Sequence, residues 1–463
     1  MKSHIASLAV ACFASALLAP SAGAQSIPNL FPFPDPSGLV ETNNTGSAPI
    51  DSTGPFFRPL GTNGRSCATC HLPDQGWSIT PLQLQVRFLL SGGTDPVFRT
   101  VDGSNCDQNI DVSTVAGRQK AYSVLLTRGL IRVALAVPSS AQFRVVSVQN
   151  PYGCSSASTL SMYRRPLPAA NLRYLNTIMW DGRESAPAPT QKITQSSYPS
   201  ALLADLAHQA LDAVSGHAEG NTPLSDADQQ AIVSFEMGIT TAQELDFGTG
   251  SLHSQGGKGG ASNLVNQPFF IGVNDPLGQN PTNAAFTSKI FDLFDAWVSI
   301  SQHDPRASIA RGQTVFNTKP IAITGVAGLN DATGQPVING FCGTCHDTPN
   351  VGNHSVAAPL NIGVADTTNP LGVSYLPVIT LQNIATGETV QTTDPGRALV
   401  TGQWADIGKF KGPVLRGLAA RAPYFHNGSA QSLGDVVDFY NQRFNIGLTA
   451  QEKNDLIAFL KAL

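Results

Sequence analysis

The stretch Phe341-Cys342-Gly343-Thr344-Cys345-His346 contains a C-x-x-C-H motif, and the motif occurs earlier in the chain as Cys67-Ala68-Thr69-Cys70-His71. This spacing suits covalent haem, because two thiols can form thioethers with the two vinyl groups while the adjacent histidine binds the iron. A single copy could also be a redox dithiol or half of a zinc site. Two copies in one exported chain predict two covalently bound haem c groups, with His71 and His346 as the iron ligands.

The N-terminus, residues 1–24, has the features of a secretory signal peptide. A basic Lys2 precedes an apolar segment from Ile5 to Leu18, and Ala22-Gly23-Ala24 provides a small-residue cleavage site. The apolar segment is too short to span a bilayer, and no later stretch qualifies as a span. We therefore expect a soluble mature protein, periplasmic or secreted. The alternative, a lipoprotein anchored at Cys12, is weakened by a poor lipobox sequence before that residue.

Cysteine usage agrees with an oxidising compartment. The chain has seven cysteines, of which Cys12 lies in the expected signal peptide and four belong to the two haem motifs. The remaining two, Cys106 and Cys154, are a natural disulfide pair in an exported protein. The alternative is two buried free thiols. In either case we expect a structural role and not a catalytic one.

Length and composition limit the class of protein. A chain of 463 residues exceeds the usual size of one hydrophobic core, so two haem domains fit its length. Only 13% of the residues are charged, while there are 43 glycines and 32 prolines, which favours a compact, loop-rich protein whose cofactors supply much of the core. The formal net charge of −4 is small and argues against nucleic-acid binding.

The order of segments predicts a mainly α fold with two c-type cytochrome domains and long loops. Residues 25–60, rich in Pro, Asn, Gly and Ser, read as an extended leader over the surface. Residues 61–303 form the N-terminal haem domain in this interpretation, and residues 304–463 the C-terminal one. Two β-like runs, Leu130–Val137 and Phe143–Val148, are joined by a short link and predict a β-hairpin insertion in the first domain.

Apolar periodicity predicts helices at Leu202 to Val214 and Ser225 to Thr241. In the second domain, Ala307 to Phe316 resembles the helix that opens a c-type cytochrome domain. The last helix begins at Thr449, where Glu452 completes a capping box. A terminal helix that crosses the opening helix is how a c-type domain closes its haem crevice.

Further motifs follow one order along the chain. Trp180-Asp181-Gly182-Arg183 lies between the two C-x-x-C-H copies, and Phe410-Lys411-Gly412-Pro413-Val414-Leu415-Arg416-Gly417 and Ala422-Pro423-Tyr424-Phe425-His426-Asn427-Gly428-Ser429 follow them. This order resembles the bacterial di-haem cytochrome c peroxidase and MauG superfamily. The resemblance covers most of the chain from about Gly61, and the expected hairpin region is the chief departure.

The resemblance implies different roles for the two haems. The haem attached at Cys67 and Cys70 is where hydrogen peroxide reacts. The haem attached at Cys342 and Cys345 takes in or stores electrons. The resemblance also implies that Trp180 lies between the haems as an electron bridge, a role that suits a large, flat and oxidisable indole. The alternative for Trp180 is packing in the core.

The second axial ligand of the C-terminal haem separates members of the superfamily. In the peroxidases it is a methionine fourteen residues beyond the histidine of the P-Y-F-H sequence, and counting from His426 reaches Tyr440. No methionine follows the second haem motif. MauG-type enzymes have tyrosine here, so the resemblance implies Tyr440 as an iron ligand. A soft thioether favours Fe(II), whereas a phenolate favours Fe(III) and higher states. The alternative for Tyr440 is packing at the end of a helix.

The peroxide side of the first haem departs from the superfamily. Members use a glutamate, preceded by a glutamine, to move a proton between the two peroxide oxygens. Gln191 can stand for the glutamine. No carboxylate occupies the glutamate position, and Asp205 is the nearest acid. Either Asp205 or a residue of the expected hairpin insertion serves instead, or rapid turnover of peroxide is lost. His208 and His217 have no partner at metal-ligand spacing, so we interpret them as surface or structural histidines.

Two further correspondences concern charged groups between the domains. The superfamily binds calcium through an asparagine just upstream of the W-D-G-R motif, and that position is Arg165 here. A guanidinium cannot bind Ca²⁺ but could contact haem propionates. Calcium is therefore left open, and Arg183 is another candidate partner for a propionate.

Three functions are consistent with these residues. The first is an exported di-haem peroxidase that reduces hydrogen peroxide with electrons from a small redox protein such as a cytochrome c or cupredoxin. The second is a MauG-like oxidase or oxygenase that acts on a protein or organic substrate through a high-valent di-haem state. The third is a non-enzymatic electron-transfer cytochrome. Members of the superfamily are often dimers, so a homodimer is a candidate assembly.

Overall fold

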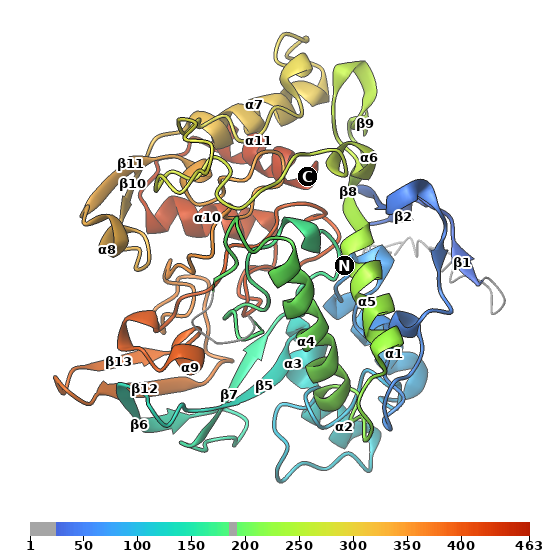
Figure 1. The fold of residues 1–463 in the computed structure, drawn as a ribbon, viewed down its shortest axis with the longest axis vertical. Coiled ribbons are helices and arrows are strands. Elements are labelled where there is room, and N and C mark those ends of the chain that lie inside the picture. Colours follow the sequence, from blue (N-terminus) through green and yellow to red (C-terminus); the bar gives the residue numbers. More distant parts are fainter. Residues whose placement is uncertain (1–24, 185–191) are drawn as a thin grey trace, which may run out of the picture.

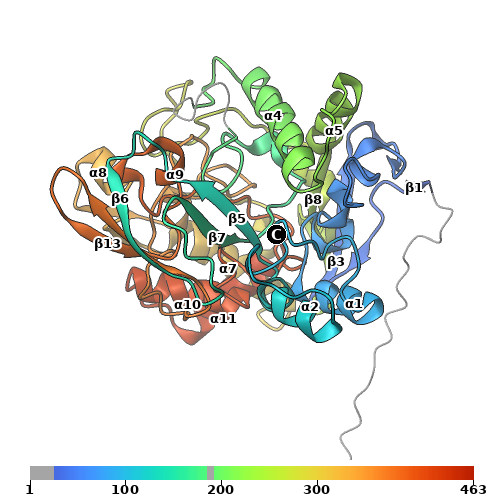
Figure 2. The same cartoon turned by 90° about the horizontal axis from the view of Figure 1, so that it is seen from below.

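The computed structural model describes residues 25–184 and 192–463. Its α-helices are α1 (Pro81–Ser91), α2 (Val115–Ala121), α3 (Ser123–Arg128), α4 (Ser200–Gly216), α5 (Asp226–Gly238), α6 (Ala261–Leu264), α7 (Pro305–Thr318), α8 (Asn330–Thr333), α9 (Ala398–Thr401), α10 (Leu433–Arg443) and α11 (Ala450–Lys461). Helices α1 to α5 gather on the right in Figure 1, whereas α7, α10 and α11 lie at the upper left. The view from below also separates α4 and α5 from α10 and α11 (Figure 2). The two C-x-x-C-H motifs thus belong to two groups of helices.

The expectation of a mainly α fold is wrong, because helices make up only 30% of the chain and strands make up 16%. The strands are β1 (Ser26–Ile27), β2 (Phe33–Pro34), β3 (Gly38–Asn44), β4 (Ile50–Asp51), β5 (Ile131–Ala136), β6 (Phe143–Gln149), β7 (Thr159–Arg164), β8 (Ile239–Asp246), β9 (Gly250–Ser251), β10 (Ile321–Thr324), β11 (Val337–Gly340), β12 (Val378–Asn383) and β13 (Thr389–Thr392). They form several small sheets of two to four strands. Frequent glycine and proline keep the helices short, and distant loop segments pair with one another instead.

The predicted β-hairpin is also absent, although both of its strands exist. Strand β5 pairs with β7, and β6 pairs with β12 in a sheet of order β13-β12-β6. The reason is hydrophobic: Phe143 of β6 packs with Ile379 and Leu381 of β12 in one buried cluster. Residues of the expected insertion therefore join a sheet whose other strands come from the second half of the chain.

The segment expected as a surface leader is partly built into the core. Strand β3 lies inside a four-stranded sheet, between β2 and β8. Its Val40 is fully buried, and Thr42 Oγ1 accepts a hydrogen bond of 2.8 Å from the indole nitrogen of Trp77. Residues 38–44 therefore help to hold the loop that follows the first haem motif.

Helices α7 and α11 cross at Gly312. A Cβ atom at this glycine would lie 2.0 Å from the carbonyl oxygen of Asp455, so only glycine permits the close approach. Arg311 Nε donates to Asp455 Oδ2 over 2.7 Å beside the crossing, and Phe316 packs against Phe459. The predicted crossing of the opening and terminal helices is confirmed. Residues 290–297, which precede α7, pack in the same hydrophobic core.

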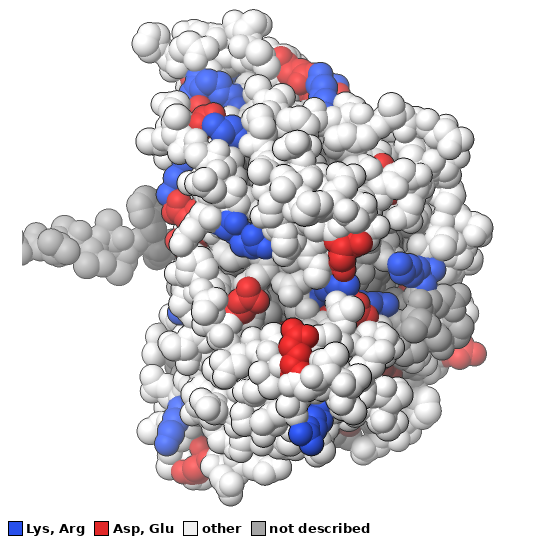
Figure 3. All heavy atoms as spheres, turned by 90° about the vertical axis from the view of Figure 1, so that its left-hand side faces the viewer, with Lys and Arg blue, Asp and Glu red and all other residues white. Residues whose placement is uncertain are grey.

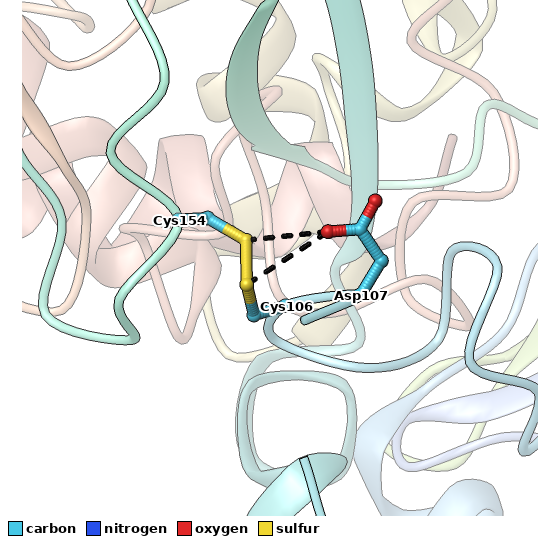
Figure 4. Close-up of side chains that lie close together, drawn as sticks. All are labelled: Cys106, Asp107 and Cys154. Carbon is cyan, nitrogen blue, oxygen red and sulfur yellow. Dashed lines mark hydrogen bonds between the residues drawn. A yellow bond between two sulfur atoms is a disulfide. The ribbon is translucent and has the colours of Figure 1, made fainter. Parts of the chain in front are cut away.

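The predicted disulfide between Cys106 and Cys154 is confirmed, with a Cα–Cα distance of 5.6 Å (Figure 4). Asp107 Oδ1 lies 3.9 and 3.7 Å from the two sulfur atoms, and the other oxygen of this carboxylate is 3.1 Å from Arg132 Nη2. The bridge ties the loop between α1 and α2, which contains Cys106, to the segment that leads into β7, which contains Cys154. Its role is structural, as expected.

The outer surface agrees with the low charge content. On the face shown in Figure 3, lysine, arginine and acidic side chains are sparse and interspersed. Within residues 25–184 and 192–463, none of the helices combines the length and apolar character that crossing a membrane requires.

Two candidate haem cavities and the wall between them

Each C-x-x-C-H motif forms one short 3-10 turn at the edge of its own cavity. The two turns have the same hydrogen bonds: the backbone N–H of the histidine donates to the carbonyl of the first cysteine, over 3.0 Å at His71 and 3.1 Å at His346. In each motif the threonine hydroxyl also accepts a hydrogen bond from the backbone N–H of the residue directly before the first cysteine, which is Ser66 in the first motif and Phe341 in the second. The four motif cysteines form no disulfide. Two matched turns with free thiols therefore face two separate cavities.

Both histidines are oriented as iron ligands require. His71 Nδ1 lies 3.0 Å from the carbonyl oxygen of Trp77, and His346 Nδ1 lies 2.6 Å from that of Gly352. An Nδ1–H that donates to a carbonyl leaves Nε2 free to bind metal. Burial lowers the pKa of both rings, that of His346 to about 4, which favours the neutral, ligating form. These residues fit a covalently attached haem in each cavity.

The first cavity lies under helix α4. One face of this helix lines it, and apolar residues of β5 and of the segment before Leu172 complete the walls. Helix α5 contributes Glu236, whose burial raises the pKa of its carboxyl to about 8. The α4 residues that line the cavity are Leu206, Gln209, Ala210, Ala213 and Val214, followed by His217 directly after the helix.

The second cavity contains both His346 and Tyr440. Helix α10 carries Tyr440, which packs among the rings of Phe425, Phe439 and Phe444. Burial, with the nearby Cys345 and Cys342 thiols, raises the pKa of the Tyr440 phenol. Among the described residues that line this cavity there is no methionine.

One wall separates the cavities and is shared by both. Trp180 lines each of them. Its indole nitrogen donates to the carbonyl of Arg165 over 2.8 Å, and its own carbonyl accepts from the backbone N–H of Lys411 over 2.9 Å. The indole also meets the ring of His426 edge to face, with centroids 6.2 Å apart. Trp180 is therefore held rigidly at the point where the cavities meet.

Three cations surround this wall: Arg165 and Lys411 are buried, and Arg421 is partly buried. Burial lowers the pKa of Arg165 to about 9, that of Arg421 to about 10 and that of Lys411 to about 8. In the described part of the chain, none of the three pairs with a carboxylate. Buried cations need a compensating anion, and haem propionates would supply it in both cavities. Arg165 occupies the position of the superfamily's calcium ligand, where its guanidinium donates to the carbonyl of Gly129 over 2.8 Å.

A buried ion-pair cluster lies beside the wall. Arg164 donates to both oxygens of Asp394 over 2.7 and 2.8 Å and also to Asp181 of the W-D-G-R motif. All three side chains are buried. Arg183 lines the first cavity and contacts Asp181 at 3.2 Å. The cluster joins the W-D-G-R segment to the second half of the chain.

The structure does not bring all of the expected site residues together. Asp205 is buried on α4 but is not among the residues that line the first cavity, and Gln191 lies outside the described residues. Several polar residues that line it were not predicted, among them Gln209, His217 and Glu236, as well as Arg65 and Asp102. A sequence signal existed for two of them, because Gln209 and His217 share the helical face of the apolar cavity residues.

Comparison with known proteins finds partial matches to cytochrome c peroxidases. No family model matches the chain. Over 135 residues it is 36% identical to "Cytochrome-c peroxidase IdrP2" of Denitromonas iodatirespirans, a match that covers 27% of this chain and 36% of that protein. The matched part of the chain is thus similar to bacterial cytochrome c peroxidases. Haem is the cofactor that these relatives imply.

Two further proteins resemble parts of the chain or its fold. A cytochrome c551 peroxidase of Nitrosomonas europaea is 30% identical over 146 residues, which is 29% of this chain and 36% of that protein. The matches thus span about a third of the length of these two curated peroxidases. A solved MauG-like protein associated with microbial copper homeostasis aligns over 88% of this chain and 87% of its own, with 16% identity and a TM-score of 0.36. A TM-score this low carries no argument about the function of this chain.

Proposed function

We propose that this chain is an exported, periplasmic di-haem oxidoreductase of the cytochrome c peroxidase type. In this proposal hydrogen peroxide reacts in the first cavity, and electrons from a small redox protein, such as a cytochrome c or cupredoxin, enter through the second. The observation that carries the proposal is the shared wall: two cavities, each with its own C-x-x-C-H motif, meet at Trp180.

The residues have distinct tasks in this function. The cysteines of each motif would hold one haem, and His71 and His346 would bind the irons through Nε2. A bound haem supplies an iron that changes oxidation state and can bind peroxide. Arg165, Lys411 and Arg421 balance the negative charge of the propionates between the two cavities.

Trp180 would carry electrons from the second cavity to the first. Its backbone and side-chain hydrogen bonds keep the indole in one orientation, which keeps any transfer distance constant. Reduction of one hydrogen peroxide to two waters takes two electrons and two protons. The second cavity therefore has to deliver electrons twice in each turnover.

A MauG-like oxidase is the second candidate, and Tyr440 is the observation that favours it. The Tyr440 phenol lines the second cavity together with His346, and no methionine is among the described residues that line it. Phenolate ligation stabilises Fe(III) and higher states and so favours storage of oxidising equivalents over uptake of electrons from a cytochrome. A non-enzymatic electron carrier is the third candidate and requires two inert, six-coordinate haems.

Visible and EPR spectra of the haem-loaded protein, before and after one equivalent of hydrogen peroxide, separate these functions. A high-spin haem that reacts quickly and then turns over with a reduced cytochrome supports the peroxidase. A long-lived oxidised species that needs Tyr440 and disappears in Tyr440→Met supports the MauG-like oxidase. Two low-spin haems that do not react with peroxide in any redox state refute both enzymatic functions.

The role of Trp180 has its own test. We expect Trp180→Phe to keep both haems but to slow peroxide-driven oxidation of the reduced second haem at least about tenfold, because phenylalanine is far harder to oxidise. Trp404→Phe is the matched control, since Trp404 packs in a cluster with Leu399 and Ile407 that lines neither cavity. Stopped-flow absorbance of the second haem measures the rate. Equal rates in Trp180→Phe and the wild type would show that Trp180 only packs.

A further inference from the structure

We propose that His217 is the proton-transferring residue of the first cavity, held in position by Asp102 and Arg65. This inference rests on the proposed peroxidase function. It identifies the group that takes the place of the superfamily's glutamate, for which the sequence offers no carboxylate at the matching position.

The three side chains form a chain of hydrogen bonds. His217 Nδ1 lies 2.5 Å from Asp102 Oδ2, and Asp102 Oδ1 accepts from Arg65 Nη1 over 2.6 Å. Arg65 in turn donates to the carbonyls of Pro96 and Val97, over 2.9 and 2.7 Å. Asp102 and Arg65 are 5% and 4% exposed. The carboxylate is therefore fixed on both sides before it contacts the imidazole.

This arrangement selects the tautomer that a base needs. Burial would raise the pKa of Asp102, but hydrogen bonds from His217 and Arg65 hold it below its usual range, so this group remains a carboxylate. A carboxylate accepts the proton of Nδ1, which leaves the lone pair on Nε2. Within residues 25–184 and 192–463, Nε2 of His217 has no hydrogen-bond partner.

His217 also belongs to the cavity in which peroxide would react. It lines this cavity together with His71, Asp102 and Arg65. The residue follows α4 directly, at the end of the helical face that covers the cavity. Asp102 and Arg65 lie near Cys70 of the first haem motif.

Other polar residues of the cavity suit this role less well. Glu236 has no orienting hydrogen bond among the described residues, and a carboxyl whose pKa burial raises to about 8 is protonated at neutral pH. The amide of Gln209 does not titrate. Asp205 does not line the cavity. His217 combines an available basic nitrogen with a fixed partner.

The proton transfer conserves atoms and charge. Nε2 of His217 accepts a proton from one oxygen of hydrogen peroxide and returns it to the other, so that this second oxygen leaves as water when the O–O bond breaks. The remaining oxygen takes two electrons, which originate in the reduced redox protein, and two protons from solvent. It leaves as the second water, and His217 ends the cycle unchanged.

Cyanide binding to the oxidised, haem-loaded protein tests the proposal without turnover. HCN must lose its proton when cyanide binds a ferric haem, so the rate depends on a base in the cavity. We expect His217→Gln to lower the rate constants for cyanide binding and for reaction with peroxide about 100-fold or more, the lower end for general acid–base catalysis. His208→Gln is the matched control: His208 also bonds a carboxylate, Glu184 Oε2 at 2.8 Å, but does not line the cavity. We expect it to bind cyanide at the wild-type rate.

Two further variants separate catalysis from folding. Imidazole added to His217→Gly is expected to restore the cyanide rate, which a merely structural role would not allow. Asp102→Asn is expected to lower the rate while haem content and the visible spectrum stay unchanged, because the imidazole loses the partner that selects its tautomer. Rescue in the first variant remains informative even if the second fails to fold.

The outcomes distinguish this proposal from the proposed function. Unchanged rates in His217→Gln, or failure of imidazole to restore the rate, would overturn the role of His217. Conversion of a low-spin wild-type haem to high spin in His217→Gln would also overturn it, because His217 would then be an iron ligand. Slow cyanide binding in His217→Gln together with a wild type inert to peroxide would support the cavity base and refute the peroxidase.

Discussion

Replacement of Arg164 by methionine should strongly destabilise the folded protein. The Arg164 side chain is only 2% exposed and bonds both oxygens of Asp394 as well as Asp181, which are 4% and 0% exposed. Methionine has a similar length but no charge. Arg164→Met would therefore leave two carboxylates buried without the guanidinium that holds them.

The expected loss in the free energy of unfolding is about 3–5 kcal/mol, the usual cost of removing one partner from a buried ion pair. The pKa of Asp181 gives a second estimate: burial would raise it, but Arg164 and then Arg183 hold it at about 2, against 3.8 for an ordinary aspartate. This difference corresponds to about 2 kcal/mol. Because the folded pKa is the lower one, the contribution is complete above pH 3.8 and disappears as the pH falls through 2. The loss of the Arg164 contact to Asp181 thus accounts for part of the expected loss, and the loss of the contact to Asp394 accounts for the rest.

Urea unfolding of the haem-loaded protein, followed by far-UV circular dichroism at neutral pH, measures the change. The control is Arg144→Met, because Arg144 on β6 is exposed and bonds only the amide oxygen of Gln382. We expect this control to change the free energy by no more than about 0.5 kcal/mol. A loss below about 1 kcal/mol in Arg164→Met would refute the conclusion that this cluster stabilises the junction of the two halves.

Two other substitutions test the fold. Gly312→Ala should lower the free energy of unfolding by about 1–3 kcal/mol in the same urea assay, because its Cβ would overlap the carbonyl of Asp455. The control is Gly216→Ala in α4, where a Cβ meets no neighbour within 4 Å and the backbone does not have a positive φ. An unchanged free energy of unfolding in Gly312→Ala would mean that α7 and α11 can move apart at little cost. The double variant Cys106→Ser/Cys154→Ser should lose about 2–4 kcal/mol, since the bridge closes a loop of sequence separation 48. Reductant should lower the free energy of unfolding of the wild type by a similar amount and leave that of the double variant unchanged. If reductant destabilised both proteins, its effect would not come from cleavage of this disulfide.

Local patterns predicted the parts of the fold that depend on neighbouring residues. The two C-x-x-C-H motifs, the helices α4, α5 and α11 and the disulfide depend on spacing, periodicity and capping, all of which are visible in a single sequence. The strands β5 and β6 were also predicted as segments. Their partners were not, because pairing depends on which distant strand buries the apolar face best, and here β12 competes with the adjacent β5.

The candidate site divides in the same way. The motif histidines, Trp180 and Tyr440 follow from spacing and from the family resemblance. The partner of His217 could not be predicted, because Asp102 lies 115 residues away along the chain and only the fold brings them together. Of the three unpaired cations at the shared wall, Arg165 was already a candidate from the resemblance. Lys411 and Arg421 could not be predicted, since a sequence does not reveal which charges the fold buries without a counterion.

The pairing of β6 with β12 has a consequence for how the two halves can be studied. A fragment that ends at residue 303 would keep β6 but lose β12, and its exposed strand edge would invite aggregation. A fragment that starts at residue 304 would lose residues 290–297 from its hydrophobic core. Neither half is then expected to behave as a free-standing module. The chain is better regarded as one folding unit. In this unit the shared sheet, and not a flexible linker, fixes the spacing between the two haem cavities.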